Sequence, residues 1–268
     1  MTAFTWRAEA NRVVIASDTL GYTITSSPMP LGFISKVVPF PHLRAALYGR
    51  GVMAVLWTAA AHLALRADVT DVDSAVEALP DILRAVTDEY AAANDIDNHR
   101  ELLLFEGYLA GYSDSRRRFV VARFTSTDDY EPLWGENEMG SLRAVPTLPD
   151  AYVPREAAGK PVETQLVAIM TAMRSFFADH PEVVPAVIGG EVQLTEVTRQ
   201  GVTSRIVHRF SDFEQTRIAA TAVAGRVARG DLDIDIAADM ARLDEALSEP
   251  EIRALQRPND LPAQQRLR

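Results

Sequence analysis

The sequence contains no cysteine and has few basic residues for its length. Its 268 residues include 37 acidic and 27 basic ones, which gives a net charge of −10 at pH 7. Without cysteine the chain has no disulfide, no thiol nucleophile and no cysteine metal site. Because a surface of this charge repels phosphates, we expect no nucleic-acid partner. The one basic run, Arg116 to Arg118, is typical of a hairpin turn.

Long hydrophobic runs are also missing. The longest apolar stretch, residues 52–65, is shorter than the ~20 residues that span a bilayer, so it predicts a buried helix. The amino terminus has no signal-peptide pattern, because Arg7, Glu9 and Arg12 interrupt any apolar core. We therefore expect a cytoplasmic protein without a membrane partner.

The sequence offers no metal or nucleotide motif. Neither a phosphate-binding loop nor a Gly-x-Ser-x-Gly motif occurs, and the histidines show no paired ligand spacing. The histidines are at positions 42, 62, 99, 180 and 208. The acidic alternation of residues 231–235 lacks the glycine and glutamate of a calcium loop, so we interpret it as a solvated turn. We expect no cofactor and no metal.

What the sequence does contain is a succession of strands, helices, strands and helices, with 47% hydrophobic residues to form a core. The expected strands are residues 2–6, 12–18, 101–112, 117–125, 188–197 and 202–210. The expected helices are residues 51–67, 71–93 with a break or kink at Pro80, a helix opened by Pro161, residues 212–230 and residues 236–247. Residues 128–160 predict a long irregular connection, which is often an interaction surface.

The first fifty residues carry the clearest chemical signal. If Met1 is removed, Thr2 supplies both a nucleophile and a base, because its freed α-amine, with a pKa of about 7.7–8.0, can take the hydroxyl proton. Asp18 closes the strand-like run that begins at Arg12, and Lys36 precedes Val37 and Val38. A nearby lysine would lower the pKa of the amine, and a carboxylate would anchor the lysine. We expect Thr2, Asp18 and Lys36 to form one constellation.

This layout resembles the proteasome β-type family of N-terminal-nucleophile hydrolases, including the bacterial proteasome-like proteases. The resemblance covers residues 2–210 and implies an α/β (α+β) fold, a four-layer αββα sandwich of two antiparallel sheets. Residues 211–268 would form a C-terminal helical extension and tail. The resemblance also implies that Gly49 lies in a turn of the oxyanion site and that Ser141, a loose match to a family serine, supports the amine.

One departure from the family pattern concerns the last strand pair. The pair Gly189-Gly190 matches, but the Asp and Ser that the family carries just before it are replaced by residues 185–188, Pro-Ala-Val-Ile. Two functions therefore stay open. The first is a threonine-type peptidase or amidohydrolase acting on a peptide or amide within a homo-oligomer. The second is a non-catalytic assembly subunit that contacts protein partners through residues 128–160 and the C-terminal tail.

Overall fold

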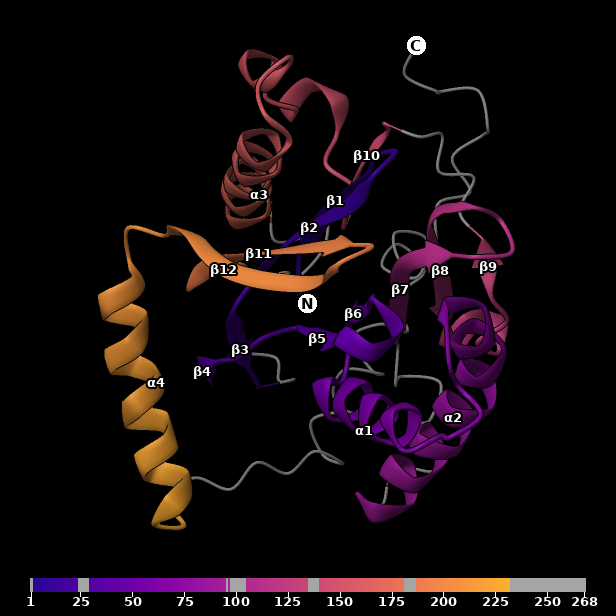
Figure 1. Ribbon diagram of the computed structural model, residues 1–268. Coiled ribbons are helices and arrows are strands. Elements are labelled where there is room, and N and C mark those ends of the chain that lie inside the picture. Colours follow the sequence, from indigo (N-terminus) through magenta and orange to yellow (C-terminus); the bar gives the residue numbers. More distant parts are fainter. Residues whose placement is uncertain are drawn as a thin grey trace.

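Two five-stranded antiparallel sheets lie face to face, and helices cover their outer faces (Figure 1). The computed structural model describes residues 2–23, 29–94, 96, 105–134, 140–180 and 187–231. The first sheet has the order β10 (Leu142–Val145), β1 (Phe4–Ala8), β2 (Arg12–Asp18), β11 (Glu191–Thr198) and β12 (Gly201–Arg209). The second has the order β5 (Val37–Phe40), β6 (Ala45–Arg50), β7 (Glu106–Ser113), β8 (Arg118–Thr125) and β9 (Leu133–Trp134). A separate hairpin joins β3 (Leu20–Tyr22) to β4 (Pro30–Phe33).

The alternation of side chains along the strands explains the layers. In β2, Val13 and Ile15 face the second sheet, whereas Val14 and Ala16 face helix α3 (Val162–Asp179). In β6, Leu47 belongs to the core under helices α1 (Met53–Ala64) and α2 (Val72–Ala93). Because both sheets bury both faces, three hydrophobic cores separate four layers. The expected αββα sandwich is confirmed.

Helix α3 shows why the periodic sequence predicted it well. Val162, Leu166, Ile169, Met170, Met173, Phe176 and Phe177 are all buried. Their spacing of three and four residues places them on one face, against the strands β1 and β2. Helix α2 begins where Asp71 accepts the backbone N–H of Ser74 in a capping box, as expected for an aspartate N-cap. Of the break or kink expected at Pro80, the break does not occur, because α2 runs through Pro80 to Ala93.

The connection between β8 and α3 is less irregular than expected. Residues 142–145 form β10, which pairs with β1 and so becomes an edge of the first sheet. This strand was not expected from the sequence, because its alternation of apolar residues is short. Three 3₁₀ turns, Ser126–Asp128, Asp150–Tyr152 and Arg155–Ala157, occupy much of the remaining described connection.

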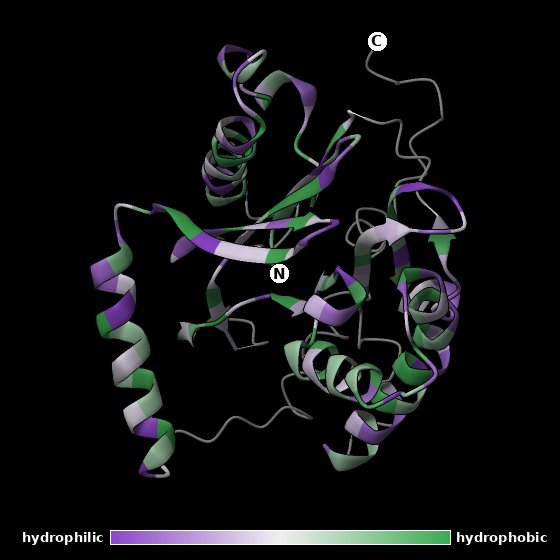
Figure 2. Cartoon of the chain, viewed as in Figure 1, coloured by the Kyte–Doolittle hydropathy of each residue, from purple (hydrophilic) through white to green (hydrophobic). Residues whose placement is uncertain are grey.

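Helix α4 (Phe213–Ala228) follows β12 and packs beside β4, at the edge of the sandwich (Figure 1). It confirms the helix expected over residues 212–230. Hydrophobic and hydrophilic residues are interspersed along it (Figure 2). The helix expected over residues 236–247, the rest of the tail and Met1 lie outside the described residues.

Candidate active site

The centre of the candidate site is a buried ion pair between Asp18 and Lys36. Asp18 ends β2, and Lys36 directly precedes β5, so the two sheets each contribute one partner. The Lys36 Nζ donates to Asp18 Oδ1 at 2.9 Å and to Oδ2 at 2.8 Å. Asp18 is 0% exposed and Lys36 is 1% exposed. Burial lowers the pKa of Lys36 below its ordinary value of 10.5, while the carboxylate of Asp18 opposes this effect.

Backbone amides from two other segments complete the environment of Asp18. The N–H of Ala3 donates to Asp18 Oδ1 at 3.1 Å, and the N–H of Gly189 donates to Oδ2 at 3.4 Å. The backbone N–H of Asp18 in turn donates to the carbonyl of Ala3 at 3.3 Å. These contacts fix the carboxylate, so it can hold the lysine in one orientation. The contact of Gly189 was not expected from the sequence, although the Gly189-Gly190 pair was noted.

Thr2 lies immediately before the residue that contacts Asp18. It is 5% exposed and precedes β1. Ala3 forms hydrogen bonds with Asp18 through both its N–H and its carbonyl. These hydrogen bonds hold the start of the chain against the end of β2. The structure therefore brings the amino-terminal segment to the Asp18–Lys36 pair, and the expectation that Thr2 itself joins this pair stays a prediction.

Gly49 lies inside β6 rather than in a turn. It pairs with Gly107 of β7, and a Cβ at Gly49 would stand 2.6 Å from the backbone carbonyl oxygen of Glu106. Close approach of the two strands therefore requires glycine here. The turn before α1 is made at Gly51, whose φ is 109°. Strands β5 and β6 are antiparallel and pair Val37 with Tyr48. Lys36, which precedes Val37, and Gly49, which follows Tyr48, therefore lie at the same end of this strand pair.

Ser141 does not join this cluster. Strand β10 runs antiparallel to β1 and pairs Leu142 with Arg7 and Val145 with Phe4. Ser141 therefore lies at the end of β1 that is far from Thr2, and the expectation that it supports the amine is wrong. The loose sequence match failed because the register of β10 was invisible before the sheet was known.

Gly190, which directly precedes β11, lies next to Gly189, the residue that contacts Asp18. Gly190 has a φ of 76°, and a Cβ there would lie 2.7 Å from both the Thr19 Oγ1 and the ring of Phe33. The Thr19 hydroxyl accepts the N–H of Glu191 at 2.9 Å. Val187 and Ile188, which precede the two glycines, carry no polar side-chain atom. The departure from the family pattern therefore persists in this segment.

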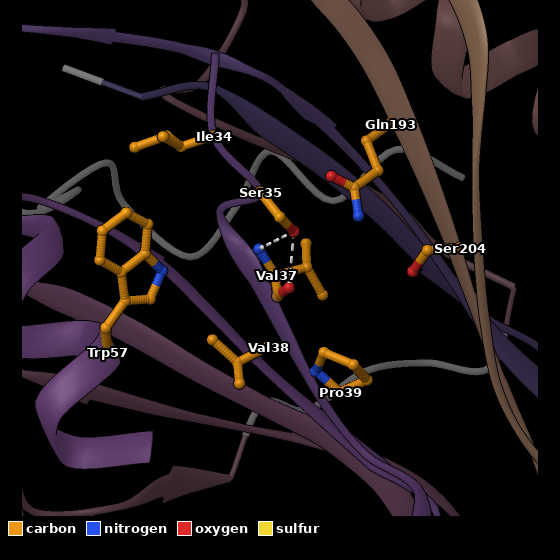
Figure 3. Close-up of a pocket in the computed structure, with 8 residues that line it drawn as sticks. All are labelled: Ile34, Ser35, Val37, Val38, Pro39, Trp57, Gln193 and Ser204. Atoms are coloured by element: carbon orange, nitrogen blue, oxygen red, sulfur yellow. Dashed lines mark hydrogen bonds between the residues drawn. The ribbon is translucent and has the colours of Figure 1, made fainter. Parts of the chain in front are cut away.

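An open apolar pocket of about 540 Å³ lies beside the lysine segment (Figure 3). It is lined by Ile34, Ser35, Val37, Val38, Pro39, Trp57, Gln193 and Ser204. Ser35 and Val37 flank Lys36 in the chain, and the Ser35 hydroxyl is bonded to both the N–H and the carbonyl of Val37. Trp57, on α1, is 43% exposed. A pocket of this lining would suit an apolar group.

Neither metal nor membrane features emerge from the described parts of the chain. No group of three or more His, Asp or Glu side chains among the described residues could hold a metal ion. No described helix has the length and hydropathy needed to cross a bilayer.

Comparison with solved structures identifies the architecture. The Anbu complex from Pseudomonas aeruginosa, described as a helical assembly, matches with a TM-score of 0.55 and 13% identity over 86% of this chain and 97% of that one. The fold of this chain is therefore similar to that of Anbu. An Anbu (Gly-1) mutant from Hyphomicrobium sp. strain MC1 has a TM-score of 0.53 and 12% identity, covering 87% of this chain and 98% of that one.

A third match is Anbu, described as an ancestral β-subunit, from Yersinia bercovieri. Its TM-score is 0.52 and its identity 10%, over 85% of this chain and 95% of that one. No family model matches the chain, and no curated protein matches its sequence. At these identities the likeness to Anbu shows the fold, and the chemistry has to be argued from the residues of this chain.

Proposed function

We propose that the chain is an N-terminal threonine peptidase or amidohydrolase that works as one subunit of a proteasome-like homo-oligomer. The single observation that carries the proposal is the buried Asp18–Lys36 pair bonded to the segment that begins at Thr2. A buried ion pair is costly to form, and strongly perturbed titratable groups cluster at functional sites.

The proposed reaction begins once Met1 has been removed. The α-amine of Thr2 takes the proton from the Thr2 hydroxyl, and the oxygen attacks the carbonyl carbon of a peptide or amide. Lys36 keeps the pKa of the amine low, and Asp18 holds Lys36 in place. Backbone N–H groups near Gly49 receive the negative oxygen of the tetrahedral intermediate.

In the second half of the reaction the two products leave and free Thr2 is restored. The protonated amine of Thr2 gives its proton to the departing amine of the substrate as the carbon–nitrogen bond breaks, which leaves an ester on the Thr2 oxygen. Water, deprotonated by the same amine, then hydrolyses this ester and restores Thr2. The apolar pocket beside Lys36 would hold an apolar group of the substrate.

A specific observation favours a second function, that of a non-catalytic assembly subunit. Val187 and Ile188 supply no polar support for the amine, and Ser141 lies at the far end of β1. In this alternative the sandwich serves as a building block, and residues 128–160 and the tail contact neighbouring proteins. The helical assembly of Anbu from Pseudomonas aeruginosa supports the proposal of a homo-oligomer in both cases.

Intact-mass measurement of the natively expressed protein separates the two functions. The mass is recorded before and after incubation with a threonine-directed electrophile, on the wild type and on Thr2→Ala. For the peptidase we expect loss of Met1 and one adduct that Thr2→Ala does not form. Two results would instead favour the non-catalytic assembly subunit. One is that Met1 is retained. The other is that Thr2 stays unmodified and the assembled wild type hydrolyses no peptide.

A further inference from the structure

Helix α4 uses only one of its faces to contact the sandwich. Among its residues only Ala220 and Val223 are buried, and Phe213 at its start stacks on Phe33 at a ring distance of 4.7 Å. Its main neighbour is strand β4. Since the two buried positions are three residues apart, they mark a single inner face, and the opposite side of the helix is left open.

The open side carries a second stripe along the helix. Ile218, Ala222, Gly225 and Arg229 follow one another at spacings of four, three and four residues. Ile218 is 63% exposed, and Ala222 is exposed as well. Arg226 flanks this stripe and forms no ion pair with any described residue. An exposed isoleucine next to small residues leaves room for another helix to approach closely.

Helix α4 ends in a defined C-cap motif. The N–H of Asp231 donates to the carbonyl of Arg226 at 2.9 Å, and the N–H of Gly230 donates to the carbonyl of Val227 at 3.0 Å. These are the two bonds of a Schellman motif, and Gly230 has the positive φ, 72°, that this motif requires. The helix therefore has a defined end at this motif and does not continue past Gly230.

The apolar residues that follow in the sequence have a spacing that matches the open side of α4. Ile236, Met240, Leu243 and Leu247 have the same spacing of four, three and four residues as the stripe on α4. Asp235, a preferred N-cap residue, directly precedes them. In an antiparallel arrangement one register places Leu247 beside Ile218, Leu243 beside Ala222, Met240 beside Gly225 and Ile236 beside Arg229. The two central pairs then set a large residue against a small one, and the pair of Leu247 and Ile218 is apolar.

The charges are complementary too. The open side of α4 is flanked by arginines, whereas the segment 236–249 has four acidic residues and one arginine. The acidic residues are Asp239, Asp244, Glu245 and Glu249. Two copies of α4 facing one another would instead oppose Arg217, Arg226 and Arg229 with the same arginines, which disfavours a second copy as the occupant.

We propose that residues 236–247 form an amphipathic helix that docks on the open side of α4 in the same chain. Residues 230–235 can span about 20 Å when extended, which exceeds the separation of about 8–10 Å between the axes of packed helices. Connections of this length are common between antiparallel helices. The C-terminal extension would then be a helical hairpin that covers Ile218. The proposal does not depend on the chemistry of Thr2.

Because the chain has no cysteine, engineered cysteine pairs test the contact directly. The full-length variants Ala222→Cys with Leu243→Cys, and Ile218→Cys with Leu247→Cys, are exposed to a mild oxidant and analysed by intact mass and peptide mapping. We expect an intramolecular disulfide in each. The control pair combines Leu243→Cys with Ala224→Cys, which is exposed on another side of α4 and should form no such bond.

Every outcome decides the proposal. A disulfide between two chains would identify a second copy as the occupant and overturn the proposal. The absence of a disulfide in both test pairs would overturn it too. So would a disulfide that forms in the control pair as fast as in the test pairs. Hydrogen exchange of the wild type gives a measurement that no substitution can disturb. We expect the amides of residues 236–247 to exchange at least tenfold more slowly than in an unstructured peptide of the same sequence, and full-rate exchange would contradict the hairpin.

Discussion

Lys36 places its ammonium group between the two carboxylate oxygens of Asp18, at 2.9 and 2.8 Å, in a position closed to solvent. The two residues come from different sheets and are joined at the end of the sandwich where the chain begins. A charge pair removed from water is expensive unless its geometry is good. This pair has that geometry, and Ala3 and Gly189 add backbone hydrogen bonds to it.

Breaking this pair on one side should be strongly destabilising. We expect Asp18→Asn and Lys36→Met each to lower the free energy of unfolding by about 3–5 kcal/mol, because each leaves its partner buried without a counter-ion. The double variant should lose less than the sum of the two single losses. Urea unfolding measures all three. In the control, Arg66→Ala breaks an exposed pair with Asp68 and should change stability little. Additive losses at Asp18 and Lys36 would contradict the coupling.

Thr2 should be indispensable for any hydrolysis, whereas a neighbouring threonine should not. We expect Thr2→Ala to abolish peptide hydrolysis and Thr2→Ser to retain part of it, because serine keeps both the hydroxyl and the terminal amine. Thr5→Val is the matched control, since Thr5 lies on β1, three residues after Thr2, and its buried hydroxyl makes no hydrogen bond within the described residues. Turnover of a fluorogenic peptide measures the effect. Hydrolysis by Thr2→Ala equal to the wild type would refute the proposed nucleophile.

The acid stability of the fold should depend on Glu106. Burial alone would raise the pKa of Glu106, but Arg50, Arg123 and the Tyr108 hydroxyl, which donates to it at 2.5 Å, together hold it below its ordinary value of 4.5. A lowered pKa in the folded state means that the carboxylate stabilises the fold above pH 4.5. This contribution is lost as the pH falls through the lowered value.

The measurement is urea unfolding between pH 3 and pH 7 for the wild type and Glu106→Gln. The stability advantage of the wild type should be largest near pH 7 and should shrink steadily below pH 4.5. Glu77→Gln removes the same charge from an exposed position of α2 and serves as the control. A constant difference between wild type and Glu106→Gln across the range would show that the network does not act through the charge.

A methyl group at Gly49 should be poorly tolerated. The Cβ of Gly49→Ala would stand 2.6 Å from the backbone oxygen of Glu106, so β6 and β7 would have to separate. Overpacking of this kind typically costs about 1–3 kcal/mol. Thermal unfolding measures the loss. Hydrolysis assayed well below the melting temperature shows whether the oxyanion site proposed near Gly49 is disturbed as well. An unchanged melting temperature would mean that the strand contact is adaptable.

Part of this protein could be predicted from local pattern. The periodic residues of α3 identified its buried face without error, and the run from Arg12 to Asp18 matched β2 at both ends. Amphipathic periodicity shows which residues face a core, whichever elements form that core. These elements can therefore be predicted without knowing what they pack against. The same local reasoning left a break or a kink open at Pro80, and only the structure shows that α2 is continuous there.

From the sequence by itself, the resemblance to the proteasome β-type family implied the four layers. The residue types of a threonine nucleophile singled out Thr2, Asp18 and Lys36, because they can be recognised without coordinates. Only the tertiary structure decided that Ser141 lies away from Thr2, that Gly49 belongs to a strand, and that Gly189 binds Asp18. These outcomes depend on sheet register and on contacts between residues up to 171 positions apart. A register shift of one residue reverses the face of every side chain, and no local pattern in one chain fixes it.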